Sequence, residues 1–196
     1  MPTYLEHINK VFWGLTRGES LTRTALEWHN PAIGQTQKKI KKDDKLRGIQ
    51  WRLVIAYSGF EITVKALMNC FKPTSKGETF KNFIQKCDLP NYSPLTPPQP
   101  REQEDLEKWL SKGEGAIAKF LGVNQTDTKV INRWMIQSNE IASWEEAFKL
   151  AKALRNASAH GFLSPSKAQQ WELEPALRTL ADDLGTILAY GLKKLT

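Results

Sequence analysis

The chain of 196 residues has few of the side chains that build disulfide or metal sites: it contains two cysteines, Cys70 and Cys87, and three histidines. Two cysteines are too few for a disulfide framework, so we expect reduced thiols and a cytoplasmic protein. His7 and His29 lie far from any acid or thiol at the spacing of metal ligands, so no metal site is expected.

Long apolar runs are also absent. The most apolar stretch, 53–67, is interrupted by Glu61 and Lys65. The chain does not open with the charged region followed by an apolar region that is typical of a signal peptide. We therefore expect a soluble protein that does not enter a membrane. A phosphate-binding Walker loop, a dinucleotide fingerprint and a nucleophile elbow are missing as well, so no cofactor is expected.

The composition is that of a folded, basic domain. Hydrophobic residues make up 40% of the chain and include seven tryptophans and eight phenylalanines, enough to build a core. Lysine and arginine number 28 against 21 acidic residues, which gives a net charge of +7. This surplus favours a polyanionic partner, but on charge alone RNA, DNA and an anionic membrane are all compatible.

Apolar residues recur at intervals of three and four along most of the chain, and no strand pattern competes with them. Gly14 and Gly18 indicate the end of the first helix, and five prolines between Leu89 and Pro100 exclude regular structure there. The spacing predicts an all-α bundle with helices over 3–15, 38–71, 79–87, 101–112, 116–122, 129–137, 143–155 and 175–195.

The same pattern suggests how the domain is organised. We expect a single domain over 1–196, because no linker separates two hydrophobic cores. The long helices near the two ends of the chain predict a core from about 1–71 and 143–196. The stretch of about 72–142, with short helices and the proline-rich segment, is interpreted as an elaboration of that core.

One helix ends on residues suited to phosphate chemistry. The sequence Ser143-Trp144-Glu145-Glu146 is typical of a capping box, and Gly161 is suited to the left-handed turn that closes many helices. Between them lie Arg155 and His160, a permanent cation with a planar fork of donors and a side chain that titrates near neutral pH. A phosphate clamp and a proton shuttle are what metal-free RNA cleavage needs.

Arg155, Asn156 and His160, between a capped helix and a second long amphipathic helix, resemble the signature of the HEPN superfamily of all-α ribonucleases. That signature is an arginine, four to six residues and a histidine, often with a polar residue directly after the arginine. The resemblance covers mainly 46–71 and 143–195. It implies a HEPN-like helical bundle and a metal-independent endoribonuclease that acts on RNA as a homodimer.

In the mechanism that the resemblance implies, His160 is the general base or acid on the RNA 2′-OH and Arg155 stabilises charge on the phosphorus. Asn156 orients or hydrogen-bonds the phosphate. Relatives of this kind are toxins of toxin–antitoxin pairs, abortive-infection factors and CRISPR-associated ribonucleases, which implies a role in prokaryotic defence and an antitoxin or defence-complex partner. Phe162 stands where antitoxin-adenylylated relatives have a tyrosine, so adenylylation at that position is not expected.

Three further groups of residues each have two interpretations. Glu61 either forms an ion pair with Lys65 one turn later or supports Arg155 and His160 from the neighbouring helix. The basic run of Lys38, Lys39, Lys41 and Lys42 either binds an RNA backbone or is a solvated helix face. Trp51 and Trp134 either stack on bases or belong to the core.

The motif itself has an ordinary structural interpretation. Arg155 near a helix C-terminus favours the negative end of the helix dipole, and His160 can be a cap or a buried histidine with its hydrogen bonds satisfied. The alternative function is therefore a non-catalytic helical module that binds RNA or a protein. The two hypotheses differ in whether the Arg155 and His160 side chains face an open basic groove or a packed core.

Overall fold

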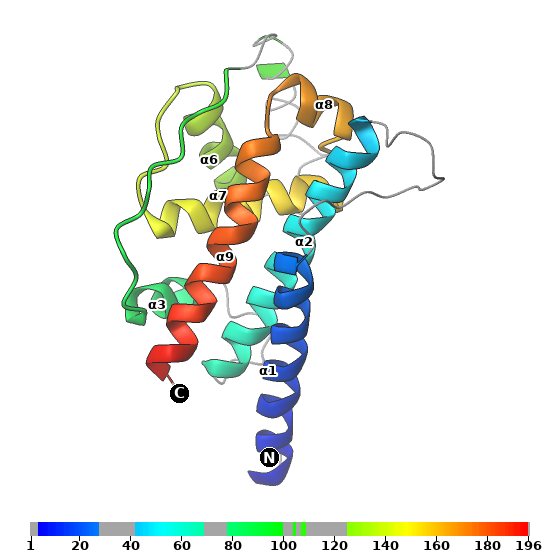
Figure 1. Ribbon diagram of the computed structural model, residues 1–196. Coiled ribbons are helices and arrows are strands. Elements are labelled where there is room, and N and C mark those ends of the chain that lie inside the picture. The colour runs from blue at the N-terminus through cyan, green and yellow to red at the C-terminus, as the bar shows by residue number, and fades with distance from the viewer. Residues whose placement is uncertain are drawn as a thin grey trace.

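The computed structural model describes residues 4–27, 42–68, 78–99, 104, 107, 108 and 125–195. In this part of the chain all regular structure is helical (Figure 1). The predicted all-α class is therefore confirmed. The helices are α1 (Tyr4–Glu27), α2 (Lys42–Leu67), α3 (Glu78–Lys86), α6 (Gln125–Met135), α7 (Trp144–Ala159), α8 (Pro165–Gln170) and α9 (Glu174–Leu195).

Helix α2 is the centre of the bundle. It packs against α1, α7 and α9, and Figure 1 shows α1 and α9 running along it while α7 crosses them. The amino-terminal half of α1 extends beyond the body of the molecule, and α8 links α7 to α9 at the opposite end. Residues far apart in sequence thus meet on α2.

The core confirms the apolar stripe of the second predicted helix. Leu46, Ile49, Leu53, Phe60 and Val64 of α2 are at most 1% exposed, because their spacing of three and four keeps them on one face of the helix. α7 and α9 cover that face with Leu150, Leu154, Leu177, Leu180 and Leu184. The intervening region joins the same core through Phe80, Phe83, Ile131 and Trp134.

The predicted end of the first helix near Leu15 is wrong, since α1 continues to Glu27. Gly14 and Gly18 are contact points between helices rather than a helix end. A Cβ at Gly14 would lie 2.7 Å from the Cβ of Ala66, and one at Gly18 would lie 2.0 Å from Oγ1 of Thr63. Glycine therefore allows α1 to approach α2 closely.

The proline-rich segment 88–99 is irregular, as the sequence predicts, and it lies along the bundle. Leu95 and Ile141 exchange backbone hydrogen bonds of 2.9 and 3.2 Å, and Trp144 Nε1 donates to the carbonyl of Pro90 at 2.6 Å. The helices predicted over 101–112 and 116–122 lie almost wholly outside the described residues. α6 begins at Gln125 rather than Lys129, and α8 was not predicted.

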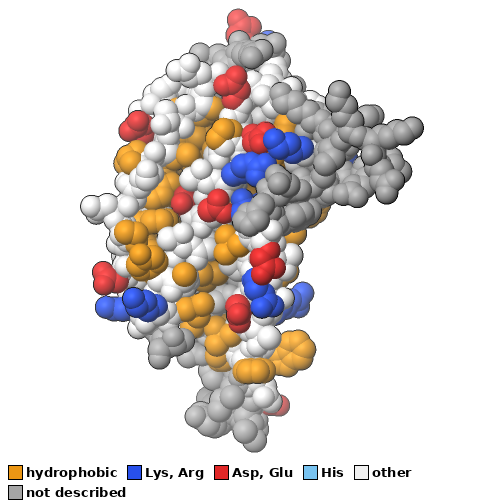
Figure 2. Space-filling view, viewed as in Figure 1, with side chains coloured by type: hydrophobic (Ala, Val, Ile, Leu, Met, Phe, Trp, Pro, Cys, Tyr) orange, Lys and Arg blue, Asp and Glu red, His pale blue; other side chains and the backbone are white. Residues whose placement is uncertain are grey.

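The surface seen in Figure 2 carries a mixture of charges. Acidic and basic side chains are interspersed among apolar ones, and no field of one sign covers this face within the described residues. The charges of the described residues are therefore not gathered into one patch on this face. No described helix combines the length and the apolar character that a bilayer crossing requires.

Candidate active site

The amino-terminal end of α7 is capped as the sequence predicts. Ser143 has extended backbone angles, and its Oγ accepts a hydrogen bond of 3.3 Å from the amide of Glu146. The Glu146 carboxylate accepts a hydrogen bond of 3.1 Å from the amide of Ala142 rather than from that of Ser143. The cap fixes where α7 begins and therefore which of its residues reach α2.

The carboxyl-terminal end of α7 is closed at the motif. The amide of His160 donates to the carbonyl of Asn156 at 3.1 Å, so helical geometry persists up to His160. Gly161 then takes a φ of +71°, and its amide donates to the carbonyl of Ser158. The predicted left-handed closing glycine is confirmed.

Arg155 is held between α7 and α2. Its Cζ lies 5.3 Å from the ring centroid of Tyr57, and its Nη1 donates to Oδ1 of Asn156 at 2.9 Å. Its buried Nε has no hydrogen-bond partner within the described residues. The guanidinium therefore has a fixed platform, and because its Nε is enclosed by protein, a ligand can reach only the rest of the half-buried side chain.

Asn156 is 8% exposed, so the structure places it inside the site wall rather than on its surface. His160, by contrast, is exposed. In helical geometry, five residues turn the Cα–Cβ direction by roughly 140° and advance about 7.5 Å. The structure thus brings Arg155 and Asn156 together, while helix geometry directs His160 away from Arg155.

Glu61 forms the simpler of its two expected contacts. Nζ of Lys65 lies 2.7 Å from Oε1 of Glu61, which confirms the ion pair between successive turns of α2. The carboxylate lies one turn beyond Tyr57, the platform of Arg155. A supporting role for Glu61 would therefore act through this face of α2, with Lys65 as its charge partner.

The other RNA-binding predictions divide in two. Lys38, Lys39 and Lys41 lie outside the described residues. Lys42 is the first residue of α2, but its side chain is not described. Trp134 is 0% exposed, so its interpretation as a stacking residue is wrong: the indole is core. Trp51 is 44% exposed and is available to a planar ligand.

A pocket of about 280 Å³ adjoins the motif where α2, the end of α7 and the start of α8 meet. Gln50 ties its walls together, because its Nε2 donates to the carbonyl of Leu163 at 2.7 Å and contacts Oγ of Ser158 at 3.4 Å. The pocket is lined by Arg47, Gln50, Trp51, Val54, Ser158, Ala159, Gly161, Leu163, Ser164 and Pro165. Sequence reasoning missed Gln50, a polar residue within the apolar stripe.

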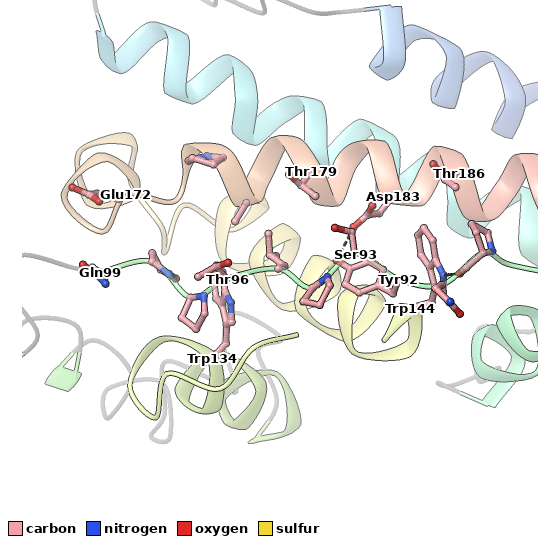
Figure 3. Close-up of a pocket in the computed structure, with 18 residues that line it drawn as sticks. Tyr92, Ser93, Thr96, Gln99, Trp134, Trp144, Glu172, Thr179, Asp183 and Thr186 are labelled. Carbon is pink, nitrogen blue, oxygen red and sulfur yellow. Dashed lines mark hydrogen bonds between the residues drawn. The ribbon is translucent and has the colours of Figure 1, made fainter. Parts of the chain in front are cut away.

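A larger cavity of about 840 Å³ lies between segment 90–99 and α9 (Figure 3). The hydroxyl of Tyr92 donates to Oδ2 of Asp183 at 2.9 Å across it. Burial raises the pKa of Asp183 to about 6, the Tyr92 hydrogen bond opposes the change and the charge of Asp182 adds to it. Burial and Asp183 also raise the pKa of Tyr92. This pair holds the segment against α9.

Among the described residues no group of three histidines, cysteines or acids is placed to hold a metal ion. Comparisons of the chain with protein-family models, with curated proteins and with solved structures find no match.

Proposed function

We propose that this protein is a HEPN-like endoribonuclease that cleaves RNA without a metal ion. The observation that carries the proposal is the state of Arg155. Its guanidinium is oriented by Tyr57 and Asn156, its side chain is only half-buried, and its helix ends at an exposed His160. A positioned cation that is not fully enclosed suits a phosphate oxygen.

In this mechanism His160 takes the proton from the 2′-OH, and the 2′-oxygen attacks the adjacent phosphorus. The bond from phosphorus to the 5′-oxygen breaks, and that oxygen leaves with a proton from an imidazolium or from water. Arg155 stabilises the negative charge on the phosphoryl oxygens. The products carry a 2′,3′-cyclic phosphate and a 5′-OH. Asn156, being buried, positions Arg155 rather than contacting the phosphate.

The active form in this proposal is a homodimer. Arg155 and His160 of one chain diverge by roughly 140° around α7, so two chains meeting near the motif would supply one phosphodiester with both groups. Light scattering at micromolar concentration measures this: we expect twice the mass of the chain of 22.3 kDa. Regulation by an antitoxin or defence-complex partner is part of the same proposal and rests on the resemblance alone.

Purified protein incubated with total RNA tests the activity. We expect wild type to generate 5′-OH ends, which polynucleotide kinase labels without prior phosphatase treatment, and His160→Ala to generate none. Because His160 is exposed, its removal should leave the melting temperature unchanged. His7→Ala is the matched control outside the motif. Full activity in His160→Ala would overturn the assignment.

A second candidate is a non-catalytic helical module that binds RNA or a protein. The observation in its favour is the burial of Asn156 and the packing of Arg155 on Tyr57, contacts that also stabilise the interface between α7 and α2. If this candidate is correct, Arg155→Ala should lower stability, and no variant should affect RNA cleavage because wild type would cleave none.

A further inference from the structure

Trp51 is exposed on the rim of the pocket beside the motif. It is 44% exposed, whereas Trp134 and Trp171 are 0% exposed in the core. An indole leaves water readily, and its flat face stacks on nucleobases regardless of their sequence. Its position at a concave pocket lined by both apolar and polar side chains indicates a planar ligand with polar edges.

The same face of α2 carries a cation next to Trp51. Arg47 is exposed one turn before Trp51, and Val54 lies one turn after it; all three line the pocket. Tyr57, which supports Arg155, follows Val54 by one more turn. Trp51 and Tyr57 are six residues apart, so their directions differ by roughly 120° around α2, and the pocket adjoins the motif through Ala159 and Gly161 rather than through Arg155.

The opposite wall is open and rigid. Ala159 and Gly161, the neighbours of His160 in the chain, both line the pocket. The space beside Gly161 is open, because a Cβ built there would meet no atom within 4 Å. The hydrogen bonds of Gln50 to Leu163 and Ser158 fix this wall to α2. Such a pocket is formed before a ligand arrives.

We infer that this pocket binds one nucleobase of single-stranded RNA next to the phosphodiester that Arg155 and His160 cleave. Trp51 stacks on the base, and Arg47 binds a backbone phosphate. The inference rests on the proposed function, which it deepens by naming an unpaired RNA strand as the substrate. A duplex keeps its bases stacked within the helix, so it does not offer one to this pocket.

The lining favours a nucleobase over a protein side chain. Polar groups stand on both walls, Arg47 and Gln50 on one and Ser158 and Ser164 on the other, among apolar groups, so the pocket can meet both the polar edges and the apolar faces of a base. A protein hot spot is instead ringed by contacts that exclude water. If Trp51 instead contacts another protein chain, the experiment below reveals it as a change of oligomer mass.

Binding is measured first in His160→Ala protein, so that no substrate is consumed. Fluorescence anisotropy with labelled oligouridylate and oligoadenylate gives the dissociation constants. We expect Trp51→Ala to weaken binding roughly tenfold and Trp51→Phe to weaken it less, because phenylalanine keeps an aromatic face. Trp13→Ala is the matched control, because Trp13 of α1 is 72% exposed and does not line the pocket.

Salt dependence separates the two residues. Arg47→Ala should lower the slope of the logarithm of affinity against the logarithm of salt by about 0.7, the value for one phosphate contact on a single strand. Trp51→Ala should leave the slope unchanged, since stacking releases no counterion. Double-stranded RNA of the same sequence should bind equally well with and without Trp51.

The outcomes distinguish this inference from the proposed function. Binding that depends on Trp51 without any cleavage by wild type supports the pocket and removes the nuclease. Cleavage that depends on His160, with binding and KM unaffected by both Trp51→Ala and Arg47→Ala, overturns the pocket and keeps the nuclease. A change of oligomer mass in Trp51→Ala with RNA binding intact also overturns it, in favour of a protein interface.

Discussion

Arg155 of α7 lies over the ring of Tyr57 of α2, with 5.3 Å between Cζ and the ring centroid. Tyr57 is 4% exposed, so the platform cannot move without disturbing the core. A cation held over a buried aromatic ring is oriented before any ligand binds, which lowers the entropy that ligand binding must overcome. Sequence spacing places both residues on long helices, and their contact arises from the way those helices cross.

The ring of Tyr57 should therefore matter for activity. We expect Tyr57→Leu to lower kcat/KM for RNA cleavage roughly tenfold, because the guanidinium of Arg155 loses its platform. Tyr57→Phe keeps the ring and should retain most of the activity. Initial cleavage rates, measured well below the melting temperature of each variant, provide the comparison. Equal losses in both variants would show that the hydroxyl, not the ring, is what matters.

The proposed chemistry predicts that cleavage persists in excess EDTA. His160 transfers the proton and Arg155 stabilises the charge, so no Lewis acid takes part. Rates with and without the chelator, on RNA exchanged into metal-free buffer, should agree. Loss of cleavage on chelation with recovery on adding Mg²⁺ or Mn²⁺ would contradict this mechanism.

Asp183 should make stability depend on pH in an unusual direction for an acid. Its pKa is raised from 3.8 to about 6 in the folded protein, so the fold prefers the protonated carboxyl. The stability contributed by that preference is fully present below about pH 4 and is lost as pH rises through about 6. Ionised Asp183 thus weakens the fold near neutral pH.

Asp183→Asn isolates this effect, because asparagine does not titrate and keeps an oxygen for the Tyr92 hydroxyl. Above pH 6 the variant should be more stable than wild type by roughly 1–3 kcal/mol, and the difference should disappear toward pH 4. Urea unfolding at a series of pH values measures it. A constant difference at all pH values would show that Asp183 does not titrate in this range.

Gly18 should be indispensable for the contact between α1 and α2. In an exposed helix, alanine at a glycine position stabilises, but a Cβ here would lie 2.0 Å from Oγ1 of Thr63 and 2.8 Å from its backbone nitrogen. We expect Gly18→Ala to lower the free energy of unfolding by about 1–3 kcal/mol. Ser20→Ala on the exposed side of α1 is the control, with an expected change within about 0.5 kcal/mol.

Much of the fold follows from local patterns in the sequence. The stripe through Leu46, Leu53 and Phe60 predicts a buried α2, and the Ser143 cap and Gly161 bracket the helix that carries the motif. Helix caps and apolar periodicity depend on residues three or four apart, so the sequence contains all the information they need. The helical class and the candidate Arg155 and His160 come from this level.

Only the tertiary structure decided what depends on residues far apart in the chain. Gly18 stands where a helix end was predicted and permits close packing against Thr63, and of two tryptophans with similar local patterns Trp134 is buried and Trp51 is exposed. Burial and packing are set by which helices cross and where, which local periodicity does not specify. The same crossing places Tyr57 beneath Arg155, and for that reason the platform of the candidate site could not be predicted from the sequence alone.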